Sequence, residues 1–206
     1  MVVGEESFLS AAADESAVAE FYDHWAANYN DDAVFYGYRG FRQLAQVCES
    51  HLQKADRILD VGAGTGLEAM ELRKRGFKAI DGHDGSRKML DCAKRRRLFK
   101  KHYLEMLKPN RPSLTFPTGF YDAVVNVGCF IPGCLDSRHV ESLILPVKIG
   151  GKLVIGTRNL EDKLKELEKD NVLRLVKEVT YEDYAEGYPG VFFVFEVLRH
   201  PGETSS

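Results

Sequence analysis

RILDVGAGTGL, at residues 57–67, is the stretch of sequence that decides the fold of this 206-residue chain. Ile58, Leu59 and Val61 form an apolar run that is too short for a helix and typical of a strand buried on both faces of a parallel sheet. The glycines that follow permit a tight turn into the helical sequence LEAMELRKR, which ends at Gly76. Because glycine has no Cβ, a ligand can approach the backbone of this turn, and the free N–H groups of the next helix attract a negative group.

The glycines stand at alternate positions, Gly62, Gly64 and Gly66, with Asp60 two residues before the first of them. Dinucleotide-binding turns have the pattern G-x-G-x-x-G, and Leu67 stands where that pattern requires glycine or alanine. The spacing therefore disfavours a nicotinamide-dependent oxidoreductase, while a turn that merely packs the strand on the helix stays an alternative. The pattern D-x-G-x-G-x-G closely resembles the first motif of the class I S-adenosylmethionine-dependent methyltransferases, a Rossmann-like family.

A second candidate ligand, Asp84, lies 24 residues after Asp60. The sequence predicts a strand over residues 77–82, and Ser86 is a suitable cap for the helix that follows. A carboxylate at the end of this strand accepts two hydrogen bonds from the hydroxyls of a ribose. Asp81 competes for this role, but it lies inside the predicted strand, and DGSRKML resembles the same family at the matching place. We therefore assign the ribose to Asp84, with a plain turn aspartate or helix cap as the alternative.

The composition describes a single soluble domain without general attraction for nucleic acid, since 44% of residues are hydrophobic, 29% are charged and the net charge is −3. The basic run KRRRLFKK at residues 94–101 lacks interleaved aromatics, so we expect a solvated helix end rather than a nucleic-acid patch. No segment reaches the roughly 18 apolar residues that span a bilayer, and no signal peptide is evident. The cysteines form no C-x-x-C pair, which favours reduced thiols over a disulfide or zinc site; they are Cys48, Cys92, Cys129 and Cys134.

We expect residues 1–13 to be a flexible lead and residues 14–54 to form a helical cap, with a polar turn over 31–37 between two helices. The first helix carries the aromatic sequence FYDHWAANY, which packs it on the domain or closes it over a ligand. This sequence is similar to the entry segment of many small-molecule methyltransferases, where aromatic and arginine side chains cover the methionine part of the cofactor. The resemblance implies that role for Tyr29 and Arg39, whose guanidinium suits a two-point contact with a carboxylate.

The third strand is expected over residues 101–107, and its end should lie beside the adenine of a bound nucleoside. Many class I methyltransferases carry an acidic residue there, which takes the adenine amino group. This chain has Met106 and Leu107 instead, so we expect apolar and backbone contacts with the adenine.

The sequence FYDAVVNVGCF predicts a buried fourth strand over residues 121–127 and resembles the F-D-x-V motif of the same family. Residues after this strand should face the reacting centre across the switch point of the sheet. Asn126 and the backbone of Val127 and Gly128 are candidates to hold the methionine ammonium group through carbonyl acceptors. Cys129 has no base partner evident in the sequence, which favours a small apolar filler over a nucleophile.

The remaining residues predict the other half of the sheet. Tyr181, Tyr184 and Tyr188 lie near the joint of the last two strands, where they either line an acceptor pocket or pack the sheet edge. The expected elements are a helix from Asp136 or Ser137 to Val147, a strand over 152–158, a charged helix over 160–170, and antiparallel strands over 174–182 and 191–199.

Taken together, the ordered motifs look like those of methyltransferase-like proteins of the Williams–Beuren syndrome region type. The resemblance implies a Rossmann-like three-layer α-β-α sandwich, with a seven-stranded, mostly parallel sheet in the order 3-2-1-4-5-7-6 and the last strand antiparallel. A single methyltransferase domain would then occupy residues 14–200, followed by a disordered tail at 201–206.

The resemblance further implies methyl transfer by in-line displacement from S-adenosylmethionine, leaving S-adenosylhomocysteine, to a small-molecule acceptor. We expect a monomeric, cytoplasmic enzyme without a metal or nucleic-acid partner, and a non-catalytic cofactor-binding protein is the alternative. No general base is assigned, because no motif distinguishes one of the histidines. The predicted cofactor-binding residues are Tyr29, Arg39, Asp60, Gly62, Ala63, Gly64, Thr65, Gly66, Asp84, Gly85, Ser86, Met89, Met106, Leu107, Asn126, Val127 and Gly128.

Overall fold

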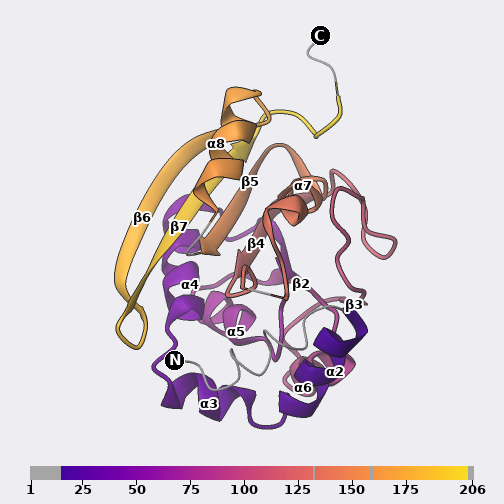
Figure 1. Cartoon of the computed structure of the whole chain (residues 1–206), viewed down its shortest axis with the longest axis vertical. Coiled ribbons are helices and arrows are strands. Elements are labelled where there is room, and N and C mark those ends of the chain that lie inside the picture. Colours follow the sequence, from indigo (N-terminus) through magenta and orange to yellow (C-terminus); the bar gives the residue numbers. More distant parts are fainter. Residues whose placement is uncertain (1–14, 132, 158–159, 204–206) are drawn as a thin grey trace.

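The computed structural model describes residues 15–131, 133–157 and 160–203, so the predicted lead at residues 1–13 lies outside the described part. Its strands form one seven-stranded sheet in the order β3-β2-β1-β4-β5-β7-β6, which confirms the predicted topology (Figure 1). Strands β1 to β5 run parallel, and β7 is antiparallel to both β5 and β6. The strands are β1 Arg57–Val61, β2 Ala79–Asp84, β3 His102–Leu104, β4 Tyr121–Val127, β5 Val147–Thr157, β6 Leu173–Ala185 and β7 Tyr188–Val197.

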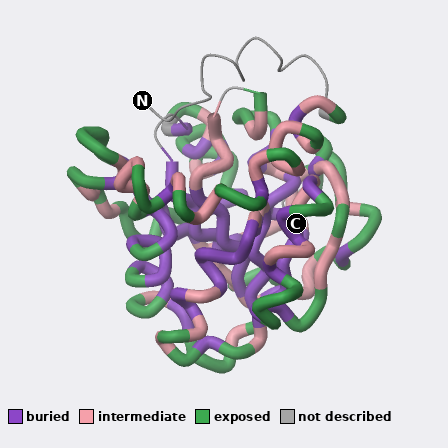
Figure 2. The backbone as a smooth tube through the Cα atoms, turned by 90° about the horizontal axis from the view of Figure 1, so that it is seen from below, coloured by how far each residue is buried: buried purple, intermediate pink, exposed green. Residues whose placement is uncertain are grey.

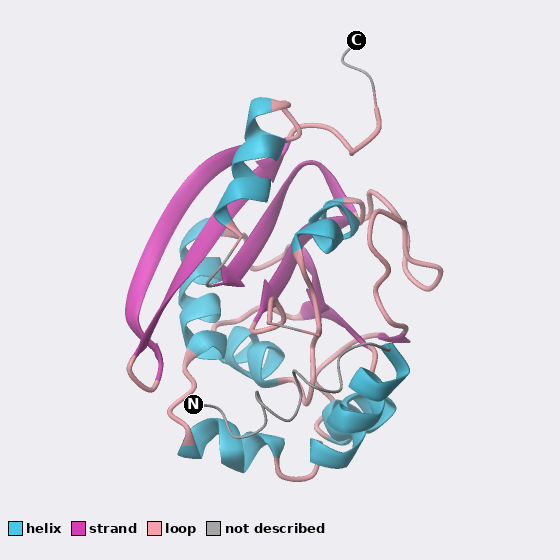
Figure 3. Cartoon of the chain, in the orientation of Figure 1, coloured by secondary structure: helices cyan, strands magenta, loops and turns pink. Residues whose placement is uncertain are grey.

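Helices cover both faces of this sheet, and Figure 3 shows the resulting three layers. One apolar cluster joins α4, α5 and α6 to the sheet, and a second joins α7 and α8 to its other face. Helices α2 and α3 lie at the end of the molecule where the parallel strands finish (Figure 1). The helices are α2 Glu15–Trp25, α3 Tyr29–Phe35, α4 Gly40–His51, α5 Leu67–Lys74, α6 Arg87–Arg95, the 3-10 helix η1 Ser137–His139, α7 Val140–Ile144 and α8 Glu161–Lys169.

The central strands are apolar on both faces because each face carries its own layer of helices. Ile58 belongs to the cluster beneath α4 and α5, whereas its neighbour Leu59 belongs to the cluster beneath α7 and α8. Phe192 and Phe193 divide in the same way on β7. Successive strand residues point to opposite faces, so an uninterrupted apolar run is what a doubly covered strand requires. Figure 2 accordingly shows the sheet buried at the centre of the molecule.

The predicted polar turn over residues 31–37 is wrong, because α3 occupies most of that segment. The first helix ends at Trp25, whose indole N–H donates to Asp32 at 2.5 Å. Ala33 packs against Phe41 and Leu67, which gives this polar sequence a buried side. Tertiary contacts thus stabilise a short helix that its local sequence does not favour.

Several element boundaries also differ from the predictions. The second strand begins at Ala79 and extends to Asp84, and the third is restricted to His102–Leu104. Helix α7 stops at Ile144 instead of Val147. Leu145 keeps a helical backbone and donates to Glu141 at 3.1 Å, but Pro146 has no N–H with which to continue the helix.

The edge of the sheet differs in the same manner, since β5 begins earlier and the last two strands are longer than predicted. Val147 already pairs with Tyr121, so the predicted start of β5 at residue 152 is wrong. Pro189 and Gly190 lie within β7, and the chain reverses at residues 186–187. These shifts leave the predicted antiparallel pairing of the last two strands intact.

A buried polar contact connects β4 to β2 across the intervening β1. The wholly buried Tyr121 donates its hydroxyl proton to Asp81 at 2.9 Å, and the backbone N–H of Lys101 donates to the same carboxylate at 3.1 Å. Burial and the hydrogen bonds to Tyr103 and Asp81 raise the pKa of Tyr121 above its usual range. Asp81 therefore serves as a hydrogen-bond acceptor inside the sheet.

We expect Tyr121→Phe to lower the free energy of unfolding by about 1–3 kcal/mol, because it removes a donor from a buried carboxylate. Urea denaturation followed by circular dichroism measures this loss. Tyr103→Phe is the matched control, since the half-buried Tyr103 hydroxyl lies at a longer distance, 3.2 Å, from the Tyr121 hydroxyl and does not contact Asp81 directly. Equal stability of the Tyr121→Phe variant and the parent chain would show that Asp81 does not depend on this donor.

Candidate active site

A cavity of about 760 Å³ opens at the carboxyl ends of β1, β2 and β4. Strand β1 lies between β2 and β4, so the sheet has its switch point there, which is where open α/β sheets bind ligands. The turn after β1, the end of β2, the segment after β4 and helix α2 form its walls. The predicted cofactor residues that line this cavity are Tyr29, Gly62, Ala63, Gly64, Thr65, Asp84, Gly85, Ser86, Met89, Met106, Leu107, Val127 and Gly128.

Four predicted residues, Arg39, Asp60, Gly66 and Asn126, are not among those lining the cavity. The Arg39 side chain is exposed and forms an ion pair with Asp183 on β6. Asp60 and Asn126 are buried beneath the turn, and each keeps one side-chain oxygen without a hydrogen-bond partner. Gly66 caps the N-terminus of α5.

The three glycines of the turn have left-handed backbones, with φ angles of +73° at Gly62, +51° at Gly64 and +87° at Gly66. A Cβ on Gly62 would lie 2.2 Å from the Cys129 Sγ atom, and one on Gly66 would lie 2.5 Å from Leu98. A Cβ on Gly64 would meet no atom within 4 Å. The outer glycines are therefore needed for packing, whereas Gly64 leaves open space in which a ligand can approach the backbone.

Asp84 connects the end of β2 to the glycine turn. Its carboxylate accepts hydrogen bonds from the backbone N–H groups of Gly64 and Ser86, each at 2.7 Å. Burial raises the pKa of Asp84 to about 6 despite these bonds. The side chain is thus held in one orientation at the cavity wall and is mostly ionised at neutral pH.

Hydrogen bonds hold the N-terminal helices over the cavity. Asp23 on α2 accepts from the Ser86 hydroxyl at 2.5 Å and from the backbone N–H of Lys88 at 2.9 Å, at the start of α6. Asn30 on α3 is 2.5 Å from the Thr65 hydroxyl in the glycine turn. Tyr29 lines the cavity from the same helix, so these contacts place an aromatic residue at its wall.

Three carboxylates lie close together beneath and beside the glycine turn. Burial, followed by the nearby Glu68 and Asp84, raises the pKa of Asp60 well above its usual value. Burial also raises the pKa of Glu68 to about 8, and Asp84 adds to that rise. Sequence reasoning missed Glu68, which lines the cavity from the first turn of α5. The sequence signal that could have identified it is an acidic residue two positions after the last glycine of the turn.

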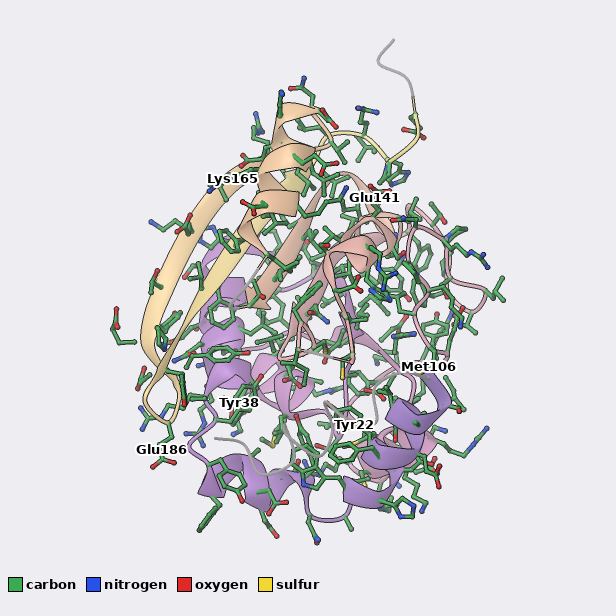
Figure 4. The ribbon with its side chains drawn as sticks, in the orientation of Figure 1. Tyr22, Tyr38, Met106, Glu141, Lys165 and Glu186 are labelled. Atoms are coloured by element: carbon green, nitrogen blue, oxygen red, sulfur yellow. The ribbon has the colours of Figure 1, made fainter. Side chains whose placement is uncertain are left out.

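The remaining wall lies between α2 and the segment after β4, and sequence reasoning missed most of it. In Figure 4, Tyr22 lies near α2 and Met106 near β3, whereas Tyr38 lies on the side of the β6–β7 pair. Tyr22 approaches Cys134 at 3.5 Å across this part of the cavity. The further residues of this wall are Val18, Ala19, Cys129, Phe130, Ile131, Leu135, Asp136, Arg138, His139 and Leu160.

The cysteines and the C-terminal tyrosines have structural surroundings. All four cysteines are free, and burial raises the pKa of Cys129 well above its usual value, so its thiol stays protonated. Tyr184 is buried against Tyr38, with ring centroids 5.5 Å apart. Neither Tyr184 nor its neighbours Tyr181 and Tyr188 are among the residues that line the cavity, which favours edge packing for all three.

Two histidines line the cavity, and their surroundings do not make either an evident base. His83 is buried, and burial lowers its pKa to about 4, so its ring is neutral at pH 7. His139 accepts a hydrogen bond from the backbone N–H of Asp136 at 3.2 Å, as part of a capping box at η1. The other two histidines considered from sequence, His24 and His102, do not line the cavity.

These features form a cavity at the switch point of the sheet. Asp84 binds the glycine turn at the cavity wall, and the open space at Gly64 allows a ligand to approach the backbone closely. The strand order of the sheet is that of the Rossmann-like methyltransferases.

Comparison with known proteins agrees with this class. Residues 58–144 match the family described as "Methyltransferase domain". The human methyltransferase-like protein 27 is 34% identical over 148 residues, which cover 70% of this chain and 59% of that protein. The chain thus spans less than two thirds of the length of this relative.

Solved structures show the same fold at low identity. A methyltransferase in complex with the Haloferax volcanii Trm112 methyltransferase activator has a TM-score of 0.65 and 17% identity, over 87% of this chain and 98% of that one. Magnesium protoporphyrin IX methyltransferase from Synechocystis, with bound S-adenosylhomocysteine, also has a TM-score of 0.65, at 13% identity over 89% of this chain and 100% of that one.

The fold is that of solved S-adenosylmethionine-dependent methyltransferases, and residues 58–144 match a methyltransferase-domain model. S-adenosylmethionine is the cofactor of that class. Within the described residues, no helix is long and apolar enough to cross a membrane.

The two glycines Gly62 and Gly64 should respond differently to alanine. Gly62→Ala combines left-handed strain with the clash against Cys129, so we expect it to lower the free energy of unfolding by about 2–5 kcal/mol. Gly64→Ala carries the strain alone, about 1–2 kcal/mol, but its methyl group fills the ligand space and should abolish S-adenosylhomocysteine binding. Thermal unfolding and calorimetry measure the two effects.

The variant Cys129→Ala provides the control for this comparison. Removing the Sγ atom should restore part of the stability lost in Gly62→Ala and leave that of Gly64→Ala unchanged. Normal ligand affinity in Gly64→Ala would exclude close approach of the ligand at this residue.

Glu68 should make the stability of the ligand-free chain depend on pH. Folding raises its pKa from 4.5 to about 8, so its contribution to stability is fully present below pH 4.5 and is lost as the pH rises through 8. We expect the melting temperature to fall between about pH 5 and pH 9, and to fall less in Glu68→Gln. Glu186→Gln, at the exposed tip of the β6–β7 pair, is the control (Figure 4). Parallel pH profiles of parent and Glu68→Gln would contradict this role.

Proposed function

We propose that this chain is an S-adenosylmethionine-dependent methyltransferase that transfers a methyl group, by in-line displacement, to a small-molecule acceptor. The observation that carries the proposal is the pairing of an open glycine turn with Asp84 in one cavity. The Gly64 N–H donates to the Asp84 carboxylate at 2.7 Å. The open backbone position and the proposed ribose-binding carboxylate are therefore hydrogen-bonded directly to each other.

The residues of the chain would bind the cofactor and exclude water from it. Asp84 would hold the ribose, and Met89, Met106 and Leu107 offer apolar surface for the adenine. Met106 lies over Gly85, where an added Cβ would come 1.9 Å from its sulfur. When bound, the cofactor supplies an already activated methyl group, so the protein's main contribution is alignment of the reacting atoms.

The part of the cavity between α2 and the segment after β4 is the proposed acceptor pocket. Its apolar and aromatic side chains include Tyr22, Phe130, Ile131, Leu135 and Leu160. Such a lining suits a compact ligand with an apolar body, since small-molecule sites are concave and mostly apolar. Asp23 connects α2 to α6, which supports a covered pocket that keeps water from the reacting atoms.

Other parts of the assignment rest on the sequence alone. The likeness to the Williams–Beuren syndrome region type, a cytoplasmic location, a monomeric state and the division at residues 14–200 stay predictions. The complex with Trm112 is a property of the structural relative.

Isothermal titration calorimetry with S-adenosylmethionine, S-adenosylhomocysteine and NADH tests the cofactor. We expect the first two to bind and NADH not to bind. Asp84→Ala should weaken both by about 1.5–3 kcal/mol, because hydrogen bonds to a charged group are lost. Asp91→Ala, on the outer side of α6, is the control. Tight NADH binding without a response to either sulfur compound would overturn the proposal.

Methyl transfer itself is tested by incubating the chain with methyl-labelled S-adenosylmethionine and a metabolite extract. A labelled small molecule that is absent with Gly64→Ala is the expected result. Cofactor binding without any labelled product would instead favour a non-catalytic binding protein.

A further inference from the structure

The charged residues that line the cavity are mostly acidic. Among the described residues, Arg138 is the lining residue with a permanent positive charge, and it is exposed. Its guanidinium already binds both oxygens of Asp136, at 2.6–3.1 Å. This pair is neutral as a unit, so Glu68 and Asp84 remain without a compensating cation in the described part of the cavity.

Glu68 is the less readily explained of the two. Asp84 accepts hydrogen bonds from the backbone N–H groups of Gly64 and Ser86, whereas no basic side chain of the described residues forms an ion pair with Glu68. It is 8% exposed, in the first turn of α5, and its own backbone N–H is the donor to its carboxylate. A helix N-terminus stabilises a nearby negative charge only modestly, whereas burial of an unpaired carboxylate is strongly unfavourable. Such a residue in a ligand cavity is suited to a cationic ligand.

Glu68 lies near Asp84 and also near two tyrosines, Tyr29 and Tyr38. Its charge acts on the hydroxyl groups of Tyr29 and Tyr38 and raises their pKa values, after the larger effect of burial. A Cβ on Gly128 would lie 2.8 Å from the Tyr38 hydroxyl, so these tyrosines approach the segment after β4. With a ribose at Asp84, the amino-acid end of the cofactor would extend toward this group of residues.

The predicted partner of the methionine carboxylate is absent from this end of the cavity. Arg39 forms its ion pair with Asp183 on β6, and it is not a lining residue. The described residues at this end therefore offer a carboxylate for an ammonium group and no basic side chain for a carboxylate. A cofactor without the methionine carboxylate would lose no ion pair there.

We propose that Glu68 binds the ammonium group of the cofactor, and that the site therefore accepts decarboxylated S-adenosylmethionine as well as S-adenosylmethionine itself. This inference rests on the proposed function, because it assumes that the adenosine occupies the cavity. Both compounds carry a net positive charge, which suits a cavity whose uncompensated groups are carboxylates. Glu68 would thereby determine which end groups the cofactor site recognises.

Calorimetry with four adenosine compounds tests the inference: S-adenosylmethionine, its decarboxylated form, S-adenosylhomocysteine and 5′-methylthioadenosine. The parent chain should bind the decarboxylated form at least as tightly as S-adenosylmethionine. Glu68→Gln should weaken the three compounds that carry an ammonium group by about 10- to 150-fold, the scale of a charged hydrogen bond. Affinity for 5′-methylthioadenosine, which lacks that group, should change less than about twofold.

Glu71→Gln is the matched control on the same helix, because Glu71 pairs with Lys74 and Arg75 outside the cavity. It should leave all four affinities unchanged. Glu68→Asp keeps the charge and should retain more affinity for the ammonium compounds than Glu68→Gln does. The comparison of the two S-adenosylmethionine forms on the parent chain needs no variant, so it tests the cofactor specificity even if Glu68→Gln does not fold, and Glu68→Asp then tests the role of the side chain.

The outcomes separate this inference from the proposed function. Equal losses for all four compounds in Glu68→Gln, or no loss at all, would overturn the role of Glu68. Binding of the decarboxylated form about 30-fold more weakly than S-adenosylmethionine would reveal a carboxylate-binding cation and overturn the specificity. Binding of none of the four compounds by the parent chain would instead mean that the proposed function has failed.

Discussion

The hydrogen bond from the Gly64 N–H to the Asp84 carboxylate is the contact on which the site depends. It joins the turn after β1 to the end of β2, and the carboxylate also accepts from Ser86 at the start of α6. The turn can make this contact because three glycines adopt left-handed backbones within five successive residues, 62–66. Two of these glycines are closely packed by Cys129 and Leu98, so the open position at Gly64 is held by its neighbours.

A second consequence of this arrangement is an excess of buried acid. Asp60, Glu68 and Asp84 lie near one another, and burial raises the pKa of each above its ordinary value. In the free chain this works against stability at neutral pH, since ionised carboxylates are costly to bury. A cationic ligand would relieve that cost. The same buried carboxylates would then account both for the lower stability of the free chain and for its affinity for a positively charged cofactor.

The N-terminal helices complete the site by contacts that are polar and distant in sequence. Asp23 reaches Ser86, and Asn30 reaches Thr65, so α2 and α3 are attached to the two loops that form the cavity wall. The cap thus depends on the same loops that line the cavity. A covered pocket is what methyl transfer requires, because alignment and exclusion of water are the main contributions of the protein.

The sequence by itself determined the local features: the strand, turn and helix around Gly62, the capping of α6 by Ser86, and the strand order implied by the ordered motifs. The strand, turn, helix and cap follow from backbone freedom, apolar periodicity and capping, which act within a few residues, whereas the strand order was predicted from the family resemblance. Only the tertiary structure decided that residues 31–35 are helical, that Arg39 pairs with Asp183, and that Glu68 faces the cavity. Each of these depends on which distant groups meet in three dimensions, and neither residue type nor spacing along the chain specifies that.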